Sequence, residues 1–380
     1  MTPDTKKILL TGGGSGGHVY PLVAVAQALR KIAAEKKVDL ELTYFGPKDR
    51  YSAIFLSSNI NVGTIPAGKI RRYFSPLIIV DIPKFFIGLL AAFFKMFWIM
   101  PDAIFSKGGT GALPVVIAGW FYGVPIIIHE SDASPGLNNL LSAPFASRIA
   151  VSFEEATKYF NSKKVAWIGS PLRSDLIGDV PSKEDAKEAL KFNPKEKLTV
   201  VLGGSQGSDR INKFLLTNLV ELLKETQVLH QTGAANFGEV EQLSRAAIAD
   251  IPVKEAAKTR YQAVAYLEDN LKPALSAADL VITRAGSGTI FEISAFGKPA
   301  ILIPLYESAN GHQMANAREF AKSGAAVVIE EPNLLPSIFI SQVKNILKNN
   351  EIVEKMSAAS KKFFKPGAAE VIAQELLRVV

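Results

Sequence analysis

Apolar runs of strand length alternate with segments of helical period along the whole chain. The expected strands, rich in β-branched residues, are 40–45, 104–106, 126–129, 149–152, 198–202, 227–231, 280–283 and 300–304. The expected helices are 21–34, 111–120, 209–224, 288–296 and 311–322. This alternation predicts parallel β-sheets that carry helices on both faces.

Two glycine-rich loops occupy matching positions in the two halves of the chain. Residues 12–17 follow the apolar run 8–10. Residues 203–207 follow the run 200–202 in the same way, and a helical segment comes after each loop. A glycine turn between a strand and a helix brings bare N–H groups and a helix N-terminus close to an anion. The sequence therefore predicts an α/β protein of two Rossmann-like domains, with parallel sheets that face across a cleft.

The length of 380 residues favours two domains over one. We place the boundary after residue 166, before a charged segment and the second glycine loop. The first domain is then 1–166 and the second is 167–366. The last helix, 367–380, is expected to cross back to the first domain.

Composition narrows the class of protein. With 48% hydrophobic and 21% charged residues, the chain is globular rather than disordered. It has no cysteine and therefore neither disulfides nor thiolate chemistry. The net charge of +7 is explained either by a lysine-rich surface or by attraction to phosphates or to an anionic membrane. Binding to nucleic acid is not favoured, because the basic residues are scattered along the chain. Residues 1–7 lead directly into a strand without a signal peptide, so the chain is expected in the cytosol.

The segment from Ile70 to Trp98 stands apart because it is apolar, aromatic and basic. A membrane span needs about 20 uninterrupted apolar residues, and Pro83, Lys84 and Lys95 interrupt this run. A buried helix and an amphipathic face resting on the bilayer both fit the pattern. Basic residues beside Phe and Trp are what a peripheral anchor needs.

The first glycine loop fits G-x-G-x-x-G through Gly12, Gly14 and Gly17. In NAD-binding domains an acidic residue at the end of the second strand holds the ribose. Here the end of the second strand, residues 44–48, contains no acidic residue. Asp49 lies too far past the strand to hold a ribose in this way. The four histidines lack metal-ligand spacing and no D-x-D pair occurs. We therefore expect no NAD, no metal and no other cofactor, with Lys, Arg, amides and helix dipoles neutralising any diphosphate.

Several polar residues at expected strand ends are candidates for chemistry, and each also has a structural explanation. His18 closes the first loop, where it either caps and packs or contacts a diphosphate and catalyses. Residues 129–132 either cap a turn or face the open end of the sheet. Residues 107–111 form a glycine turn that is either ordinary or adds N–H donors to the first loop. Glu292, one helical turn past Gly288, either caps its helix or accepts hydrogen bonds from two vicinal hydroxyls.

Together these stretches resemble the MurG family, the inverting glycosyltransferases that add N-acetylglucosamine to undecaprenyl-diphospho-N-acetylmuramoyl-pentapeptide in peptidoglycan synthesis. The resemblance covers nearly the whole chain, and the order and spacing of the motifs are more specific than any single one. The motifs are 12–18 with 20–21, 107–109, 129–130 with 135–137, 169–173, 203–207, 230–233, 284–292, 311–313 and 316–317.

This resemblance implies a glycosyltransferase B fold whose second domain holds UDP-N-acetylglucosamine as the donor substrate. Arg173 and Ser205 would contact the diphosphate, and Glu292 the ribose hydroxyls. Tyr266 and Leu267 would border the uracil. The other donor-binding residues implied by the motifs are Gln206, Gly207, Ser287, Gly288, Thr289 and Gln313.

The resemblance also implies that the first domain binds the lipid acceptor and the membrane. His18 is the first candidate for the general base that reaches the attacking 4-hydroxyl, and Asp132 is the second. The segment from Ile70 to Trp98 would rest on the cytoplasmic face of the cell membrane as a peripheral contact, where cell-wall synthesis proteins are further candidate partners. The implied acceptor-binding residues are Gly13, Gly14, Ser15, Gly16, Gly17, Gly108, Gly109 and Asn139.

The sequence departs from the commoner family pattern in two places. Asp132 stands where many members carry Asn, and Ser131 where many carry Gln. Residues 169–173 read Gly-Ser-Pro-Leu-Arg in place of Gly-Asn-Pro-Val-Arg. An aspartate is a stronger acceptor than an asparagine but lacks its two donors.

Other functions share parts of this pattern. A related glycosyltransferase acting on diacylglycerol or another lipid would have almost the same donor side. A UDP-N-acetylglucosamine epimerase would need no lipid-facing segment. A nucleotide-sugar binding protein would hold UDP without turnover, and an NAD oxidoreductase is disfavoured by the missing strand-end acid.

Overall fold

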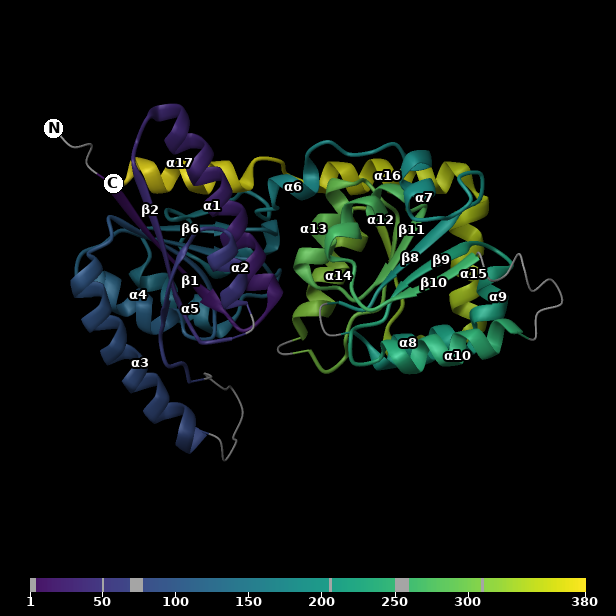
Figure 1. Cartoon of the computed structure of the whole chain (residues 1–380), viewed down its shortest axis with the longest axis horizontal. Helices are drawn as coiled ribbons and strands as arrows, with labels where there is room; N and C mark the ends of the chain where they lie inside the picture. The colour runs from purple at the N-terminus through teal and green to yellow at the C-terminus, as the bar shows by residue number, and fades with distance from the viewer. Residues whose placement is uncertain (1–4, 50, 69–77, 205–206, 250–259, 309–310) are drawn as a thin grey trace. The chain divides into compact units, whose positions relative to one another are not determined.

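The structure, a computed structural model, describes residues 5–49, 51–68, 78–204, 207–249, 260–308 and 311–380 (Figure 1). The chain divides into two compact units, Met1–Ser174 with Lys365–Val380, and Asp175–Phe364. Each unit has its own parallel sheet with helices packed on it, which confirms the predicted pair of parallel-sheet domains. The change of unit falls after Ser174, later than the expected boundary at residue 166.

The first unit contains a seven-stranded sheet in the order β3-β2-β1-β4-β5-β6-β7. The strand order reverses between β1 and β4, and ligands in open α/β sheets bind at the carboxyl ends of strands beside such a reversal. The strands are β1 (Lys6–Gly13), β2 (Leu40–Gly46), β3 (Asn61–Thr64), β4 (Ala103–Gly109), β5 (Ile126–Glu130), β6 (Arg148–Val151) and β7 (Val165–Trp167).

Helices cover both faces of this sheet (Figure 1). One buried cluster joins α1 and α17 to the strands, and a second joins α3 and α4 to the other face. The helices are α1 (Gly16–Lys36), α2 (Ser52–Ser57), α3 (Ile78–Ile99), α4 (Ala112–Phe121), α5 (Leu137–Ser142) and α17 (Ala368–Arg378), with 3-10 helices η1 (Ala143–Phe145) and η2 (Glu154–Tyr159).

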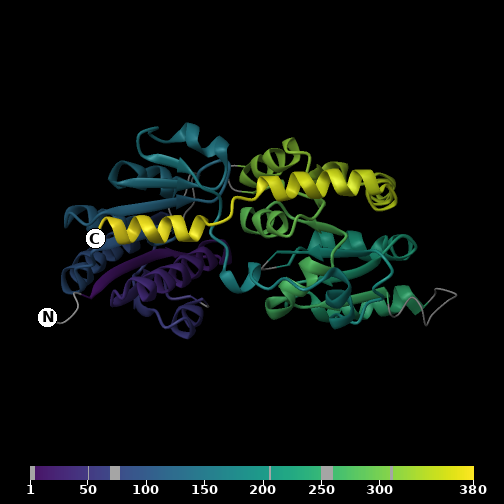
Figure 2. The ribbon, with the colours of Figure 1, turned by 90° about the horizontal axis from the view of Figure 1, so that it is seen from above.

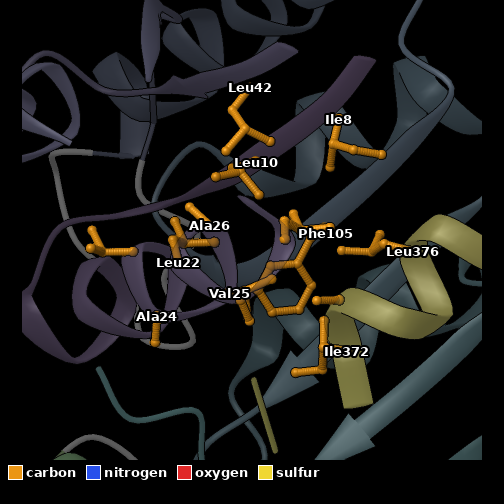
Figure 3. Packing of buried hydrophobic residues seen from close by; sticks show 14 of the residues in the cluster. Ile8, Leu10, Leu22, Ala24, Val25, Ala26, Leu42, Phe105, Ile372 and Leu376 are labelled. Carbon is orange, nitrogen blue, oxygen red and sulfur yellow. The ribbon is translucent and has the colours of Figure 1, made fainter. Parts of the chain in front are cut away.

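The last helix, α17, lies beside α1 although the two are at opposite ends of the sequence (Figures 1 and 2). Its apolar side chains recur at helical spacing, and Ile372 and Leu376 are almost fully buried. They share a cluster with Ile8, Leu10 and Phe105 from the first sheet (Figure 3). The last helix therefore packs into the core of the first unit.

The second unit contains a six-stranded parallel sheet in the order β10-β9-β8-β11-β12-β13, which reverses between β8 and β11. The strands are β8 (Leu198–Leu202), β9 (Gln227–Gln231), β10 (Tyr261–Val264), β11 (Leu280–Thr283), β12 (Ala300–Leu302) and β13 (Ala326–Val328). The helices are α6 (Ser174–Ile177), α7 (Lys183–Ala189), α8 (Asp209–Thr217), α9 (Leu219–Leu223), α10 (Phe237–Ala249), α12 (Leu271–Ala277), α13 (Ser287–Ala295), α14 (His312–Lys322), α15 (Pro336–Lys348) and α16 (Asn350–Phe363), with η3 (Glu268–Asn270) and η5 (Glu331–Asn333).

Helix α3 has two different faces. Its inner face contains Gly88, Ala92 and Met96, all buried, and a Cβ atom at Gly88 would lie 2.1 Å from the Pro66 carbonyl oxygen. Pro83 and the two lysines interrupt its apolar sequence but not the helix. By length and composition Ile79–Ile99 could cross a membrane. Only 17% of its most apolar stretch is buried inside the protein. The exposed apolar residues of α3 are Ile79, Val80, Ile82, Phe86, Ile87, Leu90, Phe94, Phe97 and Trp98.

Candidate functional site

The first glycine loop joins β1 to α1 and leaves a helix N-terminus open. Gly12 and Gly14 have φ angles of 153° and 88°, which side-chain-bearing residues rarely adopt. The side chain of Ser15, the N-cap of α1, accepts no backbone N–H of the first helical turn. The N–H groups of Gly16 and Gly17 have no intrahelical acceptor, so this turn can bind an anion.

His18 lies where the first glycine loop meets the turn after β4. Its Nδ1 shares a hydrogen bond with the Ser15 Oγ at 2.8 Å. A Cβ atom at Gly109 would lie 3.1 Å from two carbon atoms of the His18 ring. The half-buried imidazole is thereby held beside the loops predicted to bind the acceptor.

The segment after β2 supports the first glycine loop. Asp49 Oδ2 accepts the Gly14 N–H at 3.4 Å, and Asp49 Oδ1 accepts the Tyr51 N–H at 2.9 Å. The Tyr44 hydroxyl donates to the Gly12 carbonyl oxygen, and burial, together with the charge of Asp49, raises the pKa of Tyr44. Asp49, which sequence analysis dismissed as a ribose ligand, is therefore a support of the loop itself.

Glu130, at the end of β5, organises the turn that follows it. Its Oε1 accepts the Asp132 N–H at 2.9 Å, and its Oε2 accepts the Gly136 N–H at 3.0 Å and the Asn139 Nδ2–H at 2.9 Å. The residue is 3% exposed. Of the two explanations left open for residues 129–132, turn capping therefore holds for Glu130, while Asp132 stays half-buried.

Asn139 connects this turn to the glycine turn after β4. Its Nδ2 also donates to the His129 carbonyl oxygen at 3.1 Å. A Cβ atom at Gly108 would lie 2.5 Å from the Asn139 Oδ1, and Gly108 has a φ of 76°. The Asn138 Nδ2 donates to the Gly109 carbonyl oxygen at 2.8 Å. The structure thus brings Gly108, Gly109 and Asn139 together, with Asn139 buried as a support.

A buried lysine, Lys107, interacts electrostatically with the carboxylates of Glu130 and Asp132. Lys107 is 1% exposed and donates to the Ser131 hydroxyl. Burial lowers the pKa of Lys107 to about 8, although Glu130 and Asp132 act to raise it. Burial and the charge of Asp132 raise the pKa of Glu130, against the effect of Lys107. Burial and the charge of Lys107 hold the pKa of His129 well below its usual value, so this imidazole is neutral.

Arg173 follows a segment that is bound to the first unit. The Gly169 carbonyl oxygen lies 3.1 Å from the Nε2 of His129 in β5. The Ser174 N–H donates to the Gln27 Oε1 on α1 at 3.1 Å. The Arg173 guanidinium lies over the Tyr20 ring at 5.0 Å. The structure therefore places this predicted diphosphate ligand in the first unit, against Tyr20.

The second glycine loop joins β8 to α8, and two of its predicted contacts, Ser205 and Gln206, lie outside the described residues. Gly204 and Gly207 have φ angles of 78° and 79°. A Cβ atom at Gly207 would lie 2.3 Å from the Thr232 carbonyl oxygen. Glycine at 207 is thus needed for packing, whereas the space beside Gly204 is open.

Gln231, at the end of β9, links this loop to the turn predicted to border the uracil. Its Nε2 donates to the Gly204 carbonyl oxygen at 3.0 Å, and its Oε1 accepts the Leu267 N–H at 3.2 Å. Leu267 is buried, while Tyr266 is 42% exposed. In the sequence, Gln231 is marked only by its place in the motif 230–233.

The first turn of α13 carries glycine at its N-cap, Gly286, and at its second position, Gly288. Gly286 is its N-cap and makes no side-chain hydrogen bond. Cβ atoms at Gly286 and Gly288 would meet nothing within 4 Å, and neither residue has a positive φ. Neither packing nor backbone geometry therefore requires glycine here, and its effect is to leave the helix N-terminus uncovered. Ser287 and Thr289 lie on the same turn, with Glu292 half-buried one turn later.

Two side-chain amides of helix α14 make hydrogen bonds to the loops that precede α13 and α14. The Gln313 Oε1 accepts the Leu305 N–H at 2.9 Å. The buried Asn316 Nδ2 donates to the Ala285 carbonyl oxygen at 3.2 Å. The predicted donor residue Gln313 therefore also shapes the loop between β12 and α14.

Arg284 joins both sides of the reversal in the second sheet. It donates to the Ser208 Oγ at 2.9 Å and to the Ile303 carbonyl oxygen at 3.1 Å, and it lies 2.6 Å from Glu331. Ser208 in turn accepts the Ile211 N–H as the N-cap of α8. Arg284 stands in a motif that the sequence singled out, but nothing in the sequence pointed to Glu331.

His230 is used inside the second unit. The Asn212 Nδ2 donates to the Thr232 carbonyl oxygen at 2.9 Å, so Asn212 Oδ1 must accept the His230 Nε2–H at 3.0 Å. Nδ1 then accepts the Tyr261 hydroxyl at 2.9 Å. Burial lowers the pKa of His230 to about 3. Across the described ranges, no three His, Cys, Asp or Glu side chains gather as a metal-binding group.

Two family models match the chain: the glycosyltransferase family 28 N-terminal domain over residues 8–151 and the family 28 C-terminal domain over 198–372. A Bacillus cereus relative is 36% identical and covers 98% of this chain and 99% of its own length. It is named UDP-N-acetylglucosamine--N-acetylmuramyl-(pentapeptide) pyrophosphoryl-undecaprenol N-acetylglucosamine transferase 2. The chain belongs to the MurG family. A transferase of the same name, without the number, from Clostridium perfringens is 37% identical over 91% of both chains.

Solved structures show the fold that the MurG family shares with other enzymes. Acinetobacter baumannii MurG matches with a TM-score of 0.73 at 24% identity, covering 98% of this chain and 99% of its own. The Neisseria meningitidis UDP-GlcNAc 2-epimerase matches with a TM-score of 0.67 at 12% identity, covering 98% and 100%. The two-domain glycosyltransferase B fold is thus confirmed, and the fold alone does not separate transferase from epimerase.

The neutral His230 makes the stability of this MurG-family chain depend on pH. Its folded pKa of about 3 lies below the unfolded value of about 6.5, so the unfolded state binds the proton first. The neutral imidazole's contribution to the free energy of unfolding is complete above about pH 7 and is lost as the pH falls toward 3. Between pH 7 and pH 5 the loss is about 2 kcal/mol. His230→Gln should remove that part of the pH dependence of the free energy of unfolding in urea. Equal losses in both proteins would contradict this assignment.

Proposed function

We propose that this chain transfers N-acetylglucosamine from UDP-N-acetylglucosamine to the 4-hydroxyl of undecaprenyl-diphospho-N-acetylmuramoyl-pentapeptide, with inversion at the anomeric carbon. The observation that carries the proposal is the full-length similarity to transferases named for these two substrates, at 36% identity over 98% of the chain. The reaction belongs to peptidoglycan synthesis and cell-wall biogenesis.

The second unit is the proposed donor site. The uncovered first turn of α13, with Ser287, Gly288 and Thr289, supports a role in holding the diphosphate. The carboxylate of Glu292, one turn later, is proposed to accept hydrogen bonds from the ribose hydroxyls. The exposed Tyr266 precedes Leu267, whose N–H is linked to the glycine loop through Gln231, and this arrangement supports a uracil site at that turn. The remaining proposed donor contacts are Ser205, Gln206, Gly207, Leu267 and Gln313.

The first unit is the proposed acceptor site. The uncapped N–H groups of Gly16 and Gly17 are suited to an oxygen-rich anion such as the acceptor's diphosphate. The turn at Gly108 and Gly109 is packed against the same loop through His18. Gly13, Gly14, Ser15 and Asn139 are proposed to shape or contact the same anion.

In the proposed reaction the acceptor's 4-hydroxyl attacks the anomeric carbon while the bond to the UDP oxygen breaks. The leaving diphosphate gains charge, which helix N-termini, amides and Arg173 would stabilise. The hydroxyl's proton passes to a base, for which His18 comes first and Asp132 second. For His18 to accept at Nε2, its Nδ1–H must donate to the Ser15 Oγ, which lies 2.8 Å away and can act as acceptor.

Helix α3 is the proposed contact with the cytoplasmic face of the membrane. Phe94 and Trp98 are 70% and 81% exposed on its outer side. Phe121 of α4, 65% exposed, stacks edge-on against Phe93 at 5.1 Å and adds to the apolar surface. Because the inner face of α3 packs on the sheet, we propose that the helix lies in the interface rather than crossing the bilayer. Residues 69–77 of the proposed contact lie outside the described residues.

The proposed activity is tested with labelled UDP-N-acetylglucosamine and the undecaprenyl-linked muramoyl-pentapeptide in vesicles. We expect UDP release and a labelled lipid product that both depend on the acceptor. Sugar transfer to diacylglycerol, or epimerisation of the donor without an acceptor, would overturn the proposal. Tight UDP binding without release in the presence of any acceptor would identify a binding protein instead.

Gly288→Ala tests the donor site. The added methyl meets no protein atom, so the helix should be stabilised by about 0.4–1 kcal/mol. It would nevertheless block the approach of a phosphate and weaken UDP binding roughly tenfold or more, the equivalent of one charged hydrogen bond. Calorimetry measures both effects.

The matched control is Gly238→Ala, at the start of α10, where a Cβ atom would also meet nothing within 4 Å. It should stabilise the helix in the same way and leave UDP affinity unchanged. Equal UDP affinities for the Gly288 variant and the wild type would rule out a phosphate at this turn.

The α3 proposal is tested with a Phe94→Ser, Trp98→Ser double variant and vesicles containing anionic lipid. Losing two aromatic side chains worth about 1.5–3 kcal/mol each on burial should weaken vesicle binding at least tenfold. Leu243→Ser, on the exposed side of α10, is the control that should not change it. UDP binding should be the same in all three proteins, and unchanged sedimentation of the double variant would contradict the proposal.

A further inference from the structure

Arg284 lies at the carboxyl edge of the second sheet, where the donor is proposed to bind, and it contacts several segments there. It follows β11 directly. Its guanidinium donates to the Ile303 carbonyl oxygen, just past β12, at 3.1 Å. It also donates to the Oγ of Ser208, the N-cap of α8, at 2.9 Å. One side chain thus joins the ends of β11 and β12 to the end of the second glycine loop.

Glu331 fixes this guanidinium from the side of β13. It begins η5, just past that strand, and its Oε1 lies 2.6 Å from the Arg284 Nη1. The side chains of Arg284 and Glu331 are only 11% and 9% exposed. The Glu331 Oε2 accepts the Arg210 Nη1–H at 2.8 Å and the Tyr306 N–H at 3.4 Å. Both carboxylate oxygens are therefore engaged.

The buried pair is the strong member of this network. Burial acts to raise the pKa of Glu331, but hydrogen bonding and charge from Arg284 lower it below its usual value, so the carboxylate is ionised at neutral pH. Arg210 also pairs with Glu307 at 3.0 Å, but both of these side chains are more than half exposed. Exposed ion pairs contribute little, whereas removing one partner of a buried pair leaves the other charge uncompensated. Loss of Glu331 would therefore release Arg284 from its position.

The position of Arg284 matters because two turns with a proposed role in donor binding are attached to it. Its partner Ser208 closes the glycine loop 203–207. Gly286, the N-cap of α13, follows shortly after Arg284 in the chain. A planar guanidinium bonds in fixed directions and so holds its partners in one geometry. The contacts of Arg284 therefore set the glycine loop and the start of α13 relative to each other.

We propose that Glu331 is a positioning residue for the UDP-sugar donor: through Arg284 it holds the second glycine loop and the first turn of α13 in the geometry that binds the diphosphate. The inference rests on the proposed function, in which these two turns contact the donor. Glu331 acts through Arg284 and not by contact with the substrate.

The test is the Kd for UDP of Glu331→Leu, measured by calorimetry. A displaced phosphate-binding turn loses the equivalent of one hydrogen bond to a charged group, so the Kd should rise about tenfold. Glu331→Gln keeps an oxygen that can accept from the guanidinium, and its Kd should stay within about threefold of the wild type. The KM for UDP-N-acetylglucosamine should rise in the same proportion as the Kd. Equal Kd values for Glu331→Leu and the wild type would overturn the proposal.

Glu225→Leu is the matched control. The Glu225 side chain is also 9% exposed and pairs with two cations, Lys344 at 3.2 Å and Lys348 at 2.8 Å. It lies just before β9, at the amino edge of the same sheet. Its loss should lower the unfolding midpoint as much as Glu331→Leu does and leave the Kd for UDP unchanged. An equal rise in Kd in this control would overturn a specific role for Glu331.

A double-mutant cycle decides whether Glu331 acts through Arg284. With Arg284→Met already in place there is no guanidinium to hold, so adding Glu331→Leu should change the Kd less than about twofold. Losses that multiply would overturn the proposed route. Arg210→Met keeps the buried pair and should change the Kd less than about threefold. A loss as large as that of Glu331→Leu would assign the effect to the exposed arginine and overturn the role of Arg284.

UDP binding by the wild type separates failure of this inference from failure of the proposed function. A wild type that binds no UDP would overturn the proposed donor site and this inference with it. A wild type that binds UDP, with an unchanged Kd in Glu331→Leu, would overturn the inference alone.

Discussion

Parallel pairing of β1 with β4 and of β8 with β11 is the constraint on which both units depend. Because each strand order reverses at this pair, the loops that follow the two strands diverge and leave helix starts uncovered. Helices α1, α4 and α13, which begin beside the reversals, have no side-chain cap. Helices α7 and α16, which begin elsewhere, are capped by Ser182 and Asn349. Uncapped starts are not confined to the reversals, since α5 and α15 also lack a side-chain cap, and α8, which follows β8, is capped by Ser208.

Buried polar side chains hold these loops in shape. Glu130 fixes the turn after β5, Gln231 joins the second glycine loop to the turn after β10, and Arg284 spans the reversal between β8 and β11. Glu130 and Gln231 each make two hydrogen bonds to backbone groups, and Arg284 donates to the Ile303 carbonyl oxygen and to the Ser208 hydroxyl. A hydrogen-bonded polar group in the interior is directional, unlike an apolar contact, and it can therefore set the position of a loop that has few apolar residues.

The same arrangement separates residues that contact substrates from residues that support them. Gly286 and Gly288 lack side chains where neither packing nor backbone conformation requires it, which marks them as an approach for a ligand. Gly108 and Gly207 lack side chains because their neighbours, Asn139 and Thr232, leave no room. Glycines that look equivalent in sequence thus serve opposite purposes, and only the space around each Cβ position tells them apart.

Much of the fold was contained in the sequence, because the period of apolar residues and the glycine turns are local signals. Alternating strands and helices predicted two parallel-sheet domains, and the ordered motifs identified the MurG family. Long-range contacts decided what local signals leave open. The carboxylate of Asp49 and the amide of Asn139 became supports of the glycine turns, Arg173 packed against Tyr20 in the first unit, and one face of α3 stayed exposed. Such roles depend on which side chains meet after folding, and that follows from the packing of residues far apart in the chain.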